Sequence, residues 1–116
     1  MEEPSWDVAS GDPMLATLDA GTLAGRLTVR SWRPGDSFRP LGLGGTKSLQ
    51  DLFTDEKVPR SERGLIPVVA CGDDIVWVCG LRLSEDHKVG PGCRKRIGLR
   101  AVRKTTSRRK AVERRV

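Results

Sequence analysis

The sequence has no long apolar segment and no recognisable export signal. No stretch approaches the roughly 20 consecutive apolar residues that a membrane-spanning helix needs. Residues 1–10 contain two glutamates and no basic segment ahead of an apolar one, so the pattern of a secretory signal is missing. These absences predict a cytoplasmic protein that does not enter a membrane.

Histidine and cysteine are both scarce. His87 is the single histidine, and the three cysteines, Cys71, Cys79 and Cys93, include no Cys-x-x-Cys pair. The spacing of Cys79, His87 and Cys93 matches no common zinc pattern, and an odd cysteine count does not favour a disulfide framework. We therefore expect no metal site. Cys71 and Cys79 flank an apolar run, where a thiol most often serves as a small buried hydrophobic group.

Arrangements of catalytic residues are also lacking. His87 lies beside Asp86 in a polar segment, where we expect an exposed loop histidine rather than part of a Ser-His-Asp triad. Adjacent acids such as Asp73 and Asp74 are more often solvated turn residues than carboxylates tuned for proton transfer. The Gly-rich segment 41–45 does not continue into the Gly-Lys-Ser/Thr of a phosphate-binding loop. The sequence therefore predicts no catalytic residue and no cofactor bound by this chain.

Positive charge is plentiful but unevenly placed, within a formal net charge of +6. Residues 94–116 hold eleven Lys and Arg against one acid, a charge of +10. Residues 1–93 hold ten Lys and Arg against fourteen acids, a charge of −4. A basic segment of this kind suits a polyanionic partner, and it is equally typical of a solvated chain end. Composition alone therefore leaves nucleic-acid binding open.

The chain length of 116 residues suits one domain. Seven prolines and thirteen glycines favour short elements joined by many turns. We expect residues 1–13, which are polar and interrupted by Pro and Gly, to be a linker or arm. Residues 14–102 are expected to form the domain. Residues 103–116 lack an apolar period and are expected to be a basic tail that is disordered until it binds.

Two strands are predicted in the first third of the domain, over residues 14–18 and 26–32. In the second, Leu27 and Val29 alternate with polar neighbours, and a period of two is typical of a half-buried strand. We expect the side of Leu27 and Val29 to be the apolar one. The opposite side carries two arginines and Trp32, which makes it either a solvated face or part of a binding surface.

A turn and a helix are predicted next. Pro34 followed by Gly35 predicts a type II turn, because proline fixes φ near −65° and glycine accepts a positive φ. A helix is expected to begin near Thr46, with Thr46 or Ser48 as its cap and Lys47 on its exposed side. Three apolar residues at helical spacing predict its buried stripe: Leu49, Leu52 and Phe53.

A second helical piece and a hairpin follow. Residues 58–64 read as one helical turn, with Pro59 at its first position and Arg60 and Arg63 on the same face. The β-branched runs that follow predict a hairpin whose second strand is central in the sheet. A bulge is plausible near Gly80. The runs cover residues 66–71 and 75–79, with an extension over 81–83 and a last strand over 96–102. This order predicts an α+β domain with a small mixed sheet and two short helices.

Five segments, taken in order, carry a recognisable signature. They are LTVRSWRPGDSFRPLG (27–42), KSLQDLF (47–53), KVPR (57–60) with Arg63, IPVV (66–69) and IVWVCGLRL (75–83). Each is short, but their order and spacing are specific. Together they resemble the C-terminal domain of the tRNA(Ile)-lysidine synthases, over about residues 15–89.

The resemblance implies a module rather than an enzyme. That family ligates lysine to C2 of a wobble cytidine in an isoleucine tRNA, after adenylating the base with ATP. Its chemistry belongs to an N-terminal domain with a Ser-Gly-Gly-x-Asp-Ser loop, which does not occur in this sequence. The resemblance therefore implies an α+β domain similar to one in phenylalanyl-tRNA synthetase, with no ATP site of its own. Its partners would be isoleucine tRNA and the catalytic N-terminal domain, whether the chain is a fragment or free-standing.

Six cations match the family's pattern and are the candidates for binding RNA, because phosphate contacts need positively charged donors. They are Arg33, Arg39, Lys47, Lys57, Arg60 and Arg63. The alternative for each is an ion pair within the chain, with Asp36, Asp51, Asp55, Glu56 or Glu62. Two other functions stay open: a module that stabilises a homodimer of the synthase without touching RNA, and a free-standing RNA-binding domain.

Overall fold

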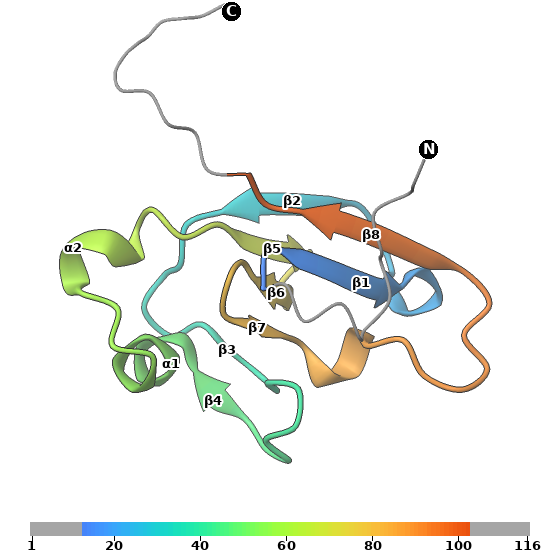
Figure 1. Ribbon diagram of the computed structural model, residues 1–116, viewed down its shortest axis with the longest axis horizontal. Helices are drawn as coiled ribbons and strands as arrows, with labels where there is room; N and C mark the ends of the chain where they lie inside the picture. The colour runs from blue at the N-terminus through green and yellow to red at the C-terminus, as the bar shows by residue number, and fades with distance from the viewer. Residues whose placement is uncertain (1–12, 103–116) are drawn as a thin grey trace, which may run out of the picture.

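A four-stranded antiparallel sheet forms the centre of the fold in the computed structural model, which describes residues 13–102 (Figure 1). Its strands, in spatial order, are β2 (Leu27–Arg30), β5 (Val68–Cys71), β6 (Asp74–Val78) and β7 (Arg82–Leu83). Two further antiparallel pairs accompany it: β1 (Leu15–Asp19) with β8 (Arg96–Arg100), and β3 (Ser37–Phe38) with β4 (Lys47–Ser48).

The helices of the described region are short. They are α1 (Leu49–Asp55), α2 (Arg60–Arg63) and two 3-10 turns, η1 (Ala20–Thr22) and η2 (Glu85–His87). The predicted α+β class with two short α-helices is confirmed, and all strand pairs within residues 13–102 are antiparallel, so the sheet is not a mixed one. Over the same residues, no helix has the length and apolar character that crossing a membrane requires.

The predicted first and last strands pair with each other. β1 starts at Leu15 rather than residue 14, and β8 ends at Arg100 rather than residue 102. The linker expected over residues 1–13 and the tail expected over 103–116 lie outside the described residues, except for Pro13. The carbonyl of Pro13 accepts a hydrogen bond from the backbone N–H of Gly80, 3.1 Å away.

The hairpin of β5 and β6 forms as predicted, with a turn that its sequence explains. Cys71 lies opposite Asp74, so the loop has two residues, and its first, Gly72, has φ +63°. A glycine at the first loop position is typical of the type II′ turn, whose twist matches that of the strands.

A bulge interrupts the same hairpin. Val69 pairs with Trp77 and Ala70 with Ile75, which leaves Val76 as an extra residue in β6. The expected bulge at Gly80 was therefore misplaced. Gly80, at φ +79°, instead lies in a tight turn in which Leu81 N donates to Val78 O at 3.0 Å.

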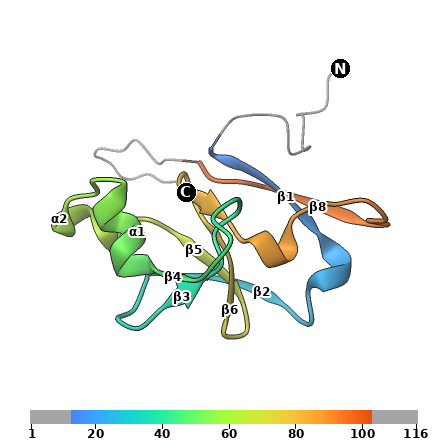
Figure 2. The same ribbon diagram turned by 90° about the horizontal axis from the view of Figure 1, so that it is seen from below.

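Two apolar clusters cover the two faces of the sheet. One packs the sheet against the β1–β8 pair and contains Leu18, Val69 and Trp77; the other packs it against α1 and contains Phe53 and Val78. Helices α1 and α2 lie at one end of the molecule and the β1–β8 pair lies at the other (Figure 2). The apolar run of β6 contributes to both clusters because successive side chains of a strand point to opposite faces, and the bulge places the consecutive residues Val76 and Trp77 in the same cluster.

Cys71 and Cys79 are buried in the first of these clusters, as the sequence predicted. Burial raises the pKa of the Cys79 thiol to about 11, so this group stays protonated at neutral pH. Both cysteines therefore act as small apolar side chains.

Strand β2 forms within the predicted range, and Leu27 packs against the core as expected, but the prediction for Val29 is wrong. Val29 is 68% exposed. Arg30 is mostly buried because Asp36 pairs with it, and Trp32 is partly buried because its ring meets that of Phe53. The carboxylate and the ring come from later in the chain, so the local alternation could not indicate them.

Helix α1 begins at Leu49, three residues later than Thr46, because residues 47–48 form strand β4. Ser48 is its cap, with Oγ accepting a hydrogen bond from Asp51 N at 3.0 Å. Lys47 thus lies on a strand rather than on the exposed side of the helix. The predicted buried stripe is confirmed at Leu49, Leu52 and Phe53.

Candidate nucleic-acid interface

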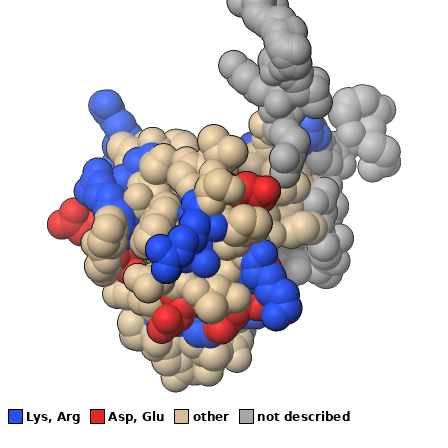
Figure 3. Space-filling model, turned by 90° about the vertical axis from the view of Figure 1, so that its left-hand side faces the viewer, with Lys and Arg blue, Asp and Glu red and all other residues tan. Residues whose placement is uncertain are grey.

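Four of the six candidate cations lie in elements at the helical end of the molecule. Arg33 follows β2, Lys57 follows α1, and Arg60 and Arg63 belong to α2. Figure 3 faces this end and shows Lys and Arg side chains spread over it, with acidic side chains among them. This surface is called the helical face below.

Three of these cations make no side-chain hydrogen bond or ion pair with any other residue among 13–102. They are Arg33, Lys57 and Arg60, and each is exposed. An exposed cation without a partner can contact a phosphate without first breaking an ion pair. For these three, the alternative of intramolecular pairing is not realised.

The other two candidates, Arg39 and Lys47, are paired within the chain. The guanidinium of Arg39 contacts the carboxylate of Asp86, and the ammonium of Lys47 contacts that of Asp55. Asp55 was among the acids that the sequence offered as partners, whereas Asp86 was not. Both pairs are partly exposed, and surface pairs contribute only about 0–1 kcal/mol to stability.

The position of Arg33 is fixed by the turn that contains it. Asp36 N donates to Arg33 O at 3.0 Å, and Gly35 has φ +93°, as the predicted type II turn requires. Asp36 also accepts hydrogen bonds from Arg33 N at 2.7 Å and from both terminal nitrogens of Arg30, at 2.9 and 3.1 Å. Asp36 therefore both caps this turn, through Arg33 N, and holds the guanidinium of Arg30.

These contacts shift the ionisation of the Arg30–Asp36 pair. Burial opposes the charged form of Asp36, but the hydrogen bonds from Arg30 and from the Arg33 backbone outweigh it and lower the pKa of Asp36. The hydrogen bond to Asp36 raises the pKa of Arg30. The pair thus stays charged and keeps Arg33 at the surface over the physiological pH range.

A cleft of about 270 Å³ lies beside the unpaired cations and is lined by Trp32, Gln50, Arg60 and Arg63. The Trp32 ring meets Phe53 edge to face, with centroids 5.4 Å apart and an interplanar angle of 79°. The guanidinium carbon of Arg63 lies 5.6 Å from the Phe53 centroid, and Nε donates to Val58 O at 3.0 Å. The indole and Arg63 are therefore both held in place.

Only part of this site was predictable from the sequence. Helical spacing correctly placed Arg60 and Arg63 together, and the alternation of β2 put Trp32 on a possible binding face. The sequence did not indicate that Gln50 belongs to the site, because its partners in the cleft come from other elements. The signal that could have found it is the exposed position of Gln50 opposite the apolar stripe of α1.

Lys57 has an unusual backbone. It is the one non-glycine residue among 13–102 with a positive φ, +60°. Its N–H donates to Thr54 O at 3.1 Å, and Val58 N donates to Phe53 O at 2.8 Å. These two bonds form the Schellman motif that ends α1, in which glycine is the usual left-handed residue. The chain thus places a cation where glycine would be less strained.

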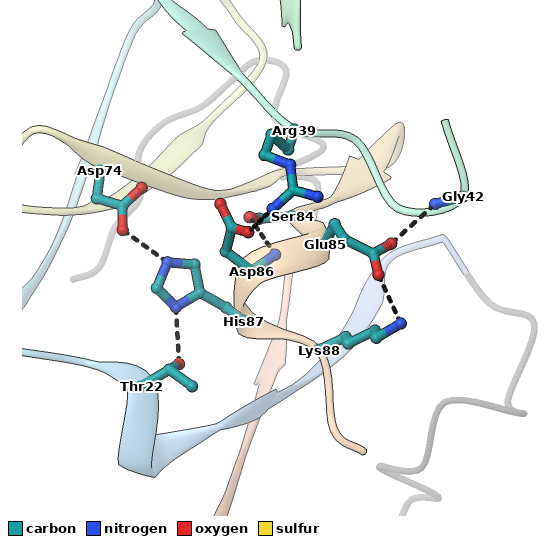
Figure 4. A network of polar contacts seen from close by, with 9 residues as sticks. All are labelled: Thr22, Arg39, Gly42, Asp74, Ser84, Glu85, Asp86, His87 and Lys88. Carbon is teal, nitrogen blue, oxygen red and sulfur yellow. Dashed lines mark hydrogen bonds and ion pairs between the residues drawn. The ribbon is translucent and has the colours of Figure 1, made fainter. Parts of the chain in front are cut away.

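His87 is not the exposed loop residue that the sequence predicted. It is 4% exposed; its Nδ1 is 2.7 Å from Thr22 Oγ1, and its Nε2 donates to Asp74 Oδ2 at 2.8 Å (Figure 4). Turn η2, capped by Ser84, directs the ring inward. The imidazole joins η1, η2 and the start of β6, so this is a structural cluster.

The same cluster continues along η2. Hydrogen bonds from Lys88 and from the backbone of Gly42 lower the pKa of Glu85, and Arg39 contacts Asp86 (Figure 4). Glu85 and Asp86, the two acids of η2, therefore connect this turn to neighbouring segments of the chain.

The chain was compared with known proteins. A family model described as the TilS substrate C-terminal domain matches residues 27–99. The tRNA(Ile)-lysidine synthase of Caldanaerobacter subterraneus subsp. tengcongensis is 51% identical over 72 residues, which are 62% of this chain and 15% of that protein. The synthase of Symbiobacterium thermophilum is 42% identical over 92 residues, 79% of this chain and 18% of that protein.

A solved structure, described as the crystal structure of the TilS C-terminal domain, has the same fold. Its TM-score is 0.70 at 30% sequence identity, with 89% of this chain and 79% of that chain covered. This chain spans about a sixth of the length of the synthases it matches. Since the family model covers more than half of the sequence, the chain belongs to the family of TilS substrate C-terminal domains.

Proposed function

We propose that this chain is the tRNA-recognition module of a tRNA(Ile)-lysidine synthase, and that it binds isoleucine tRNA through the helical face. It acts without catalysis of its own. Lysine ligation and ATP binding belong to the catalytic N-terminal domain of the synthase, which is its second partner. Family membership supports the assignment to a synthase, and the unpaired cations Arg33, Lys57 and Arg60 carry the proposal of RNA binding.

The charge distribution supports a local contact surface. Residues 13–102 contain fourteen Lys and Arg and ten Asp and Glu, and four of these cations lie in residues 94–100, in and just before β8. The rest of the domain, residues 13–93, has no net formal charge, and a surface without a general positive field attracts phosphate only where its cations are grouped and unpaired. The helical face meets that condition, because Lys57 precedes α2 by three residues and Arg33 follows Trp32, which lines one cleft with the two arginines of α2.

The direct test is a titration of the chain with isoleucine tRNA at two salt concentrations. We expect binding that weakens as salt rises, because each phosphate contact adds about 0.9 to the log–log slope on duplex DNA and a comparable amount on RNA. Absence of binding at low salt would contradict the proposal. A concentration-dependent dimer in sedimentation would then support the dimer-stabilising alternative.

Lys57 offers a test in which stability and binding move in opposite directions. Lys57→Gly is expected to raise the free energy of unfolding by about 1 kcal/mol, because glycine adopts the left-handed conformation without the steric cost that lysine incurs. The same substitution removes a phosphate contact and should weaken tRNA binding. Chemical denaturation and the tRNA titration measure the two effects.

Two variants at the same position serve as controls. Lys57→Ala loses the charge and keeps the strained backbone, so it should weaken binding without stabilising the fold. Lys57→Arg keeps both the charge and the strain, and should resemble the parent. Unchanged tRNA affinity in the Gly and Ala variants would remove Lys57 from the proposed interface.

A further inference from the structure

The cleft on the helical face combines two guanidinium groups with two other kinds of side chain that phosphate contacts alone do not require. Trp32 provides an aromatic ring, Gln50 an amide, and Arg60 and Arg63 two guanidinium groups. The side chains of Gln50 and Arg60 make no hydrogen bond with any residue among 13–102. Arg63 uses Nε for Val58 O, which leaves its two terminal nitrogens for another acceptor.

The aromatic member is fixed in advance. Trp32 is partly buried against the cluster below α1, and its contact with Phe53 sets the orientation of the indole. Phe53 is itself completely buried, so it cannot move away from the ring. A ring held in this way can receive a planar group without paying for its own ordering.

The size of the cleft limits its occupant. At about 270 Å³ it is smaller than typical small-molecule sites, which range over roughly 300–1,000 Å³. It suits one planar ring with an attached anion. Aromatic stacking, an amide that both donates and accepts, and guanidinium groups for phosphate are together the contacts that proteins make with an unpaired nucleotide.

We propose that this cleft binds a single unstacked RNA nucleotide. Its base stacks on Trp32, the amide of Gln50 hydrogen-bonds the base edge, and Arg60 and Arg63 hold the adjoining phosphate. The proposal rests on the proposed function, because it makes the cleft part of the tRNA interface. It adds that the domain recognises an unpaired position in the RNA as well as the phosphate backbone.

The test compares two RNA hairpins that differ in one feature. The first is fully paired at its end, and the second carries the same stem with a short single-stranded extension. For the parent chain we expect the extension to improve affinity about tenfold, within the range that stacking of one base provides. Trp32→Leu and Gln50→Ala should abolish this gain and leave affinity for the paired hairpin unchanged.

A second cleft variant and one control variant outside the cleft keep the comparison decisive. Trp32 packs on Phe53, so Trp32→Leu can also perturb the fold; Gln50→Ala, at an exposed helix position, loses the amide without that effect. Arg33→Ala lies outside the cleft and should weaken binding of both hairpins by the same factor, so that the gain from the extension persists.

Each result separates this inference from the proposed function. If the parent binds both hairpins equally, or if the gain survives in both cleft variants, the nucleotide site is wrong while RNA binding stands. If the parent binds neither hairpin nor tRNA, both proposals fail. Binding of an acidic phosphopeptide that is lost in Gln50→Ala, with no effect of the RNA extension, would assign the cleft to a protein partner instead.

Discussion

Replacement of Trp77 by alanine is expected to lower the free energy of unfolding by about 3–5 kcal/mol, the usual cost of deleting a buried tryptophan side chain. Trp77 is 3% exposed and lies in β6, in the cluster that joins the sheet to the β1–β8 pair. No strand of that pair belongs to the four-stranded sheet. Apolar packing therefore makes a main contribution to holding the four-stranded sheet and the β1–β8 pair together. Trp77 is the largest side chain of this cluster.

This loss is a large fraction of the total stability of a small domain, which is about 5–15 kcal/mol. Chemical denaturation followed by circular dichroism measures it. Leu65→Ala is the control: Leu65 is 78% exposed, so truncation should change stability by less than about 0.5 kcal/mol. A cooperative transition that Trp77→Ala leaves unchanged would contradict the packing of β6 against the β1–β8 pair.

The parts of the fold that the sequence predicted correctly have local causes. Ser48 caps α1 with its own hydroxyl, and Gly72 provides the positive φ that the β5–β6 turn needs. The apolar stripe of α1 follows helical spacing and is buried. In each case, residues within a few positions of one another determine the conformation, and propensity, capping and turn rules apply directly.

The predictions that were wrong concern residues whose contacts are made with partners far away in the sequence. Val29 was expected on the buried side of β2, but Phe53 gives Trp32 its packing partner on the other side. His87 was expected in solvent because its neighbours in sequence are polar. Its partners, Thr22 and Asp74, are 65 and 13 residues away, and no local pattern indicates that they meet.

In the candidate site, too, the features with local causes were predictable and those that depend on long-range contacts were not. Arg60 and Arg63 share a helical turn, so their proximity was predictable from spacing alone. Which cations stay unpaired was not predictable, because the pairs Arg39–Asp86 and Lys47–Asp55 depend on how β3 and β4 pack against η2 and α1. The structure therefore divides the six candidates into three unpaired cations, two cations in ion pairs, and Arg63, whose Nε donates to Val58 O.

The triple substitution Arg33→Ala, Lys57→Ala and Arg60→Ala is expected to weaken tRNA binding by roughly two to three orders of magnitude at low salt. Each removes an unpaired cation, and hydrogen bonds to charged groups contribute about 1.5–3 kcal/mol each when buried and less at a surface. The salt slope should fall by about 0.9 per lost contact. Titrations with tRNA and with an unrelated RNA duplex measure both quantities.

The chain offers a control with the same loss of charge. Arg39, Lys47 and Arg82 each face a carboxylate, of Asp86, Asp55 and Glu56 respectively. Their triple alanine variant loses three positive charges as well, but it also releases three acids, and we expect a much smaller fall in tRNA affinity.

The basic C-terminal segment is tested in parallel. Deleting residues 103–116 removes seven Lys and Arg. If these bind any phosphate, affinity should fall alike for tRNA and for the unrelated duplex, whereas the Arg33, Lys57 and Arg60 variant should weaken tRNA more, because fixed cations match one RNA shape. Suppose instead that this variant binds tRNA like the parent while the deletion abolishes all binding. The helical face is then not the RNA-binding surface, and a dimer-stabilising role for the folded domain becomes the better explanation.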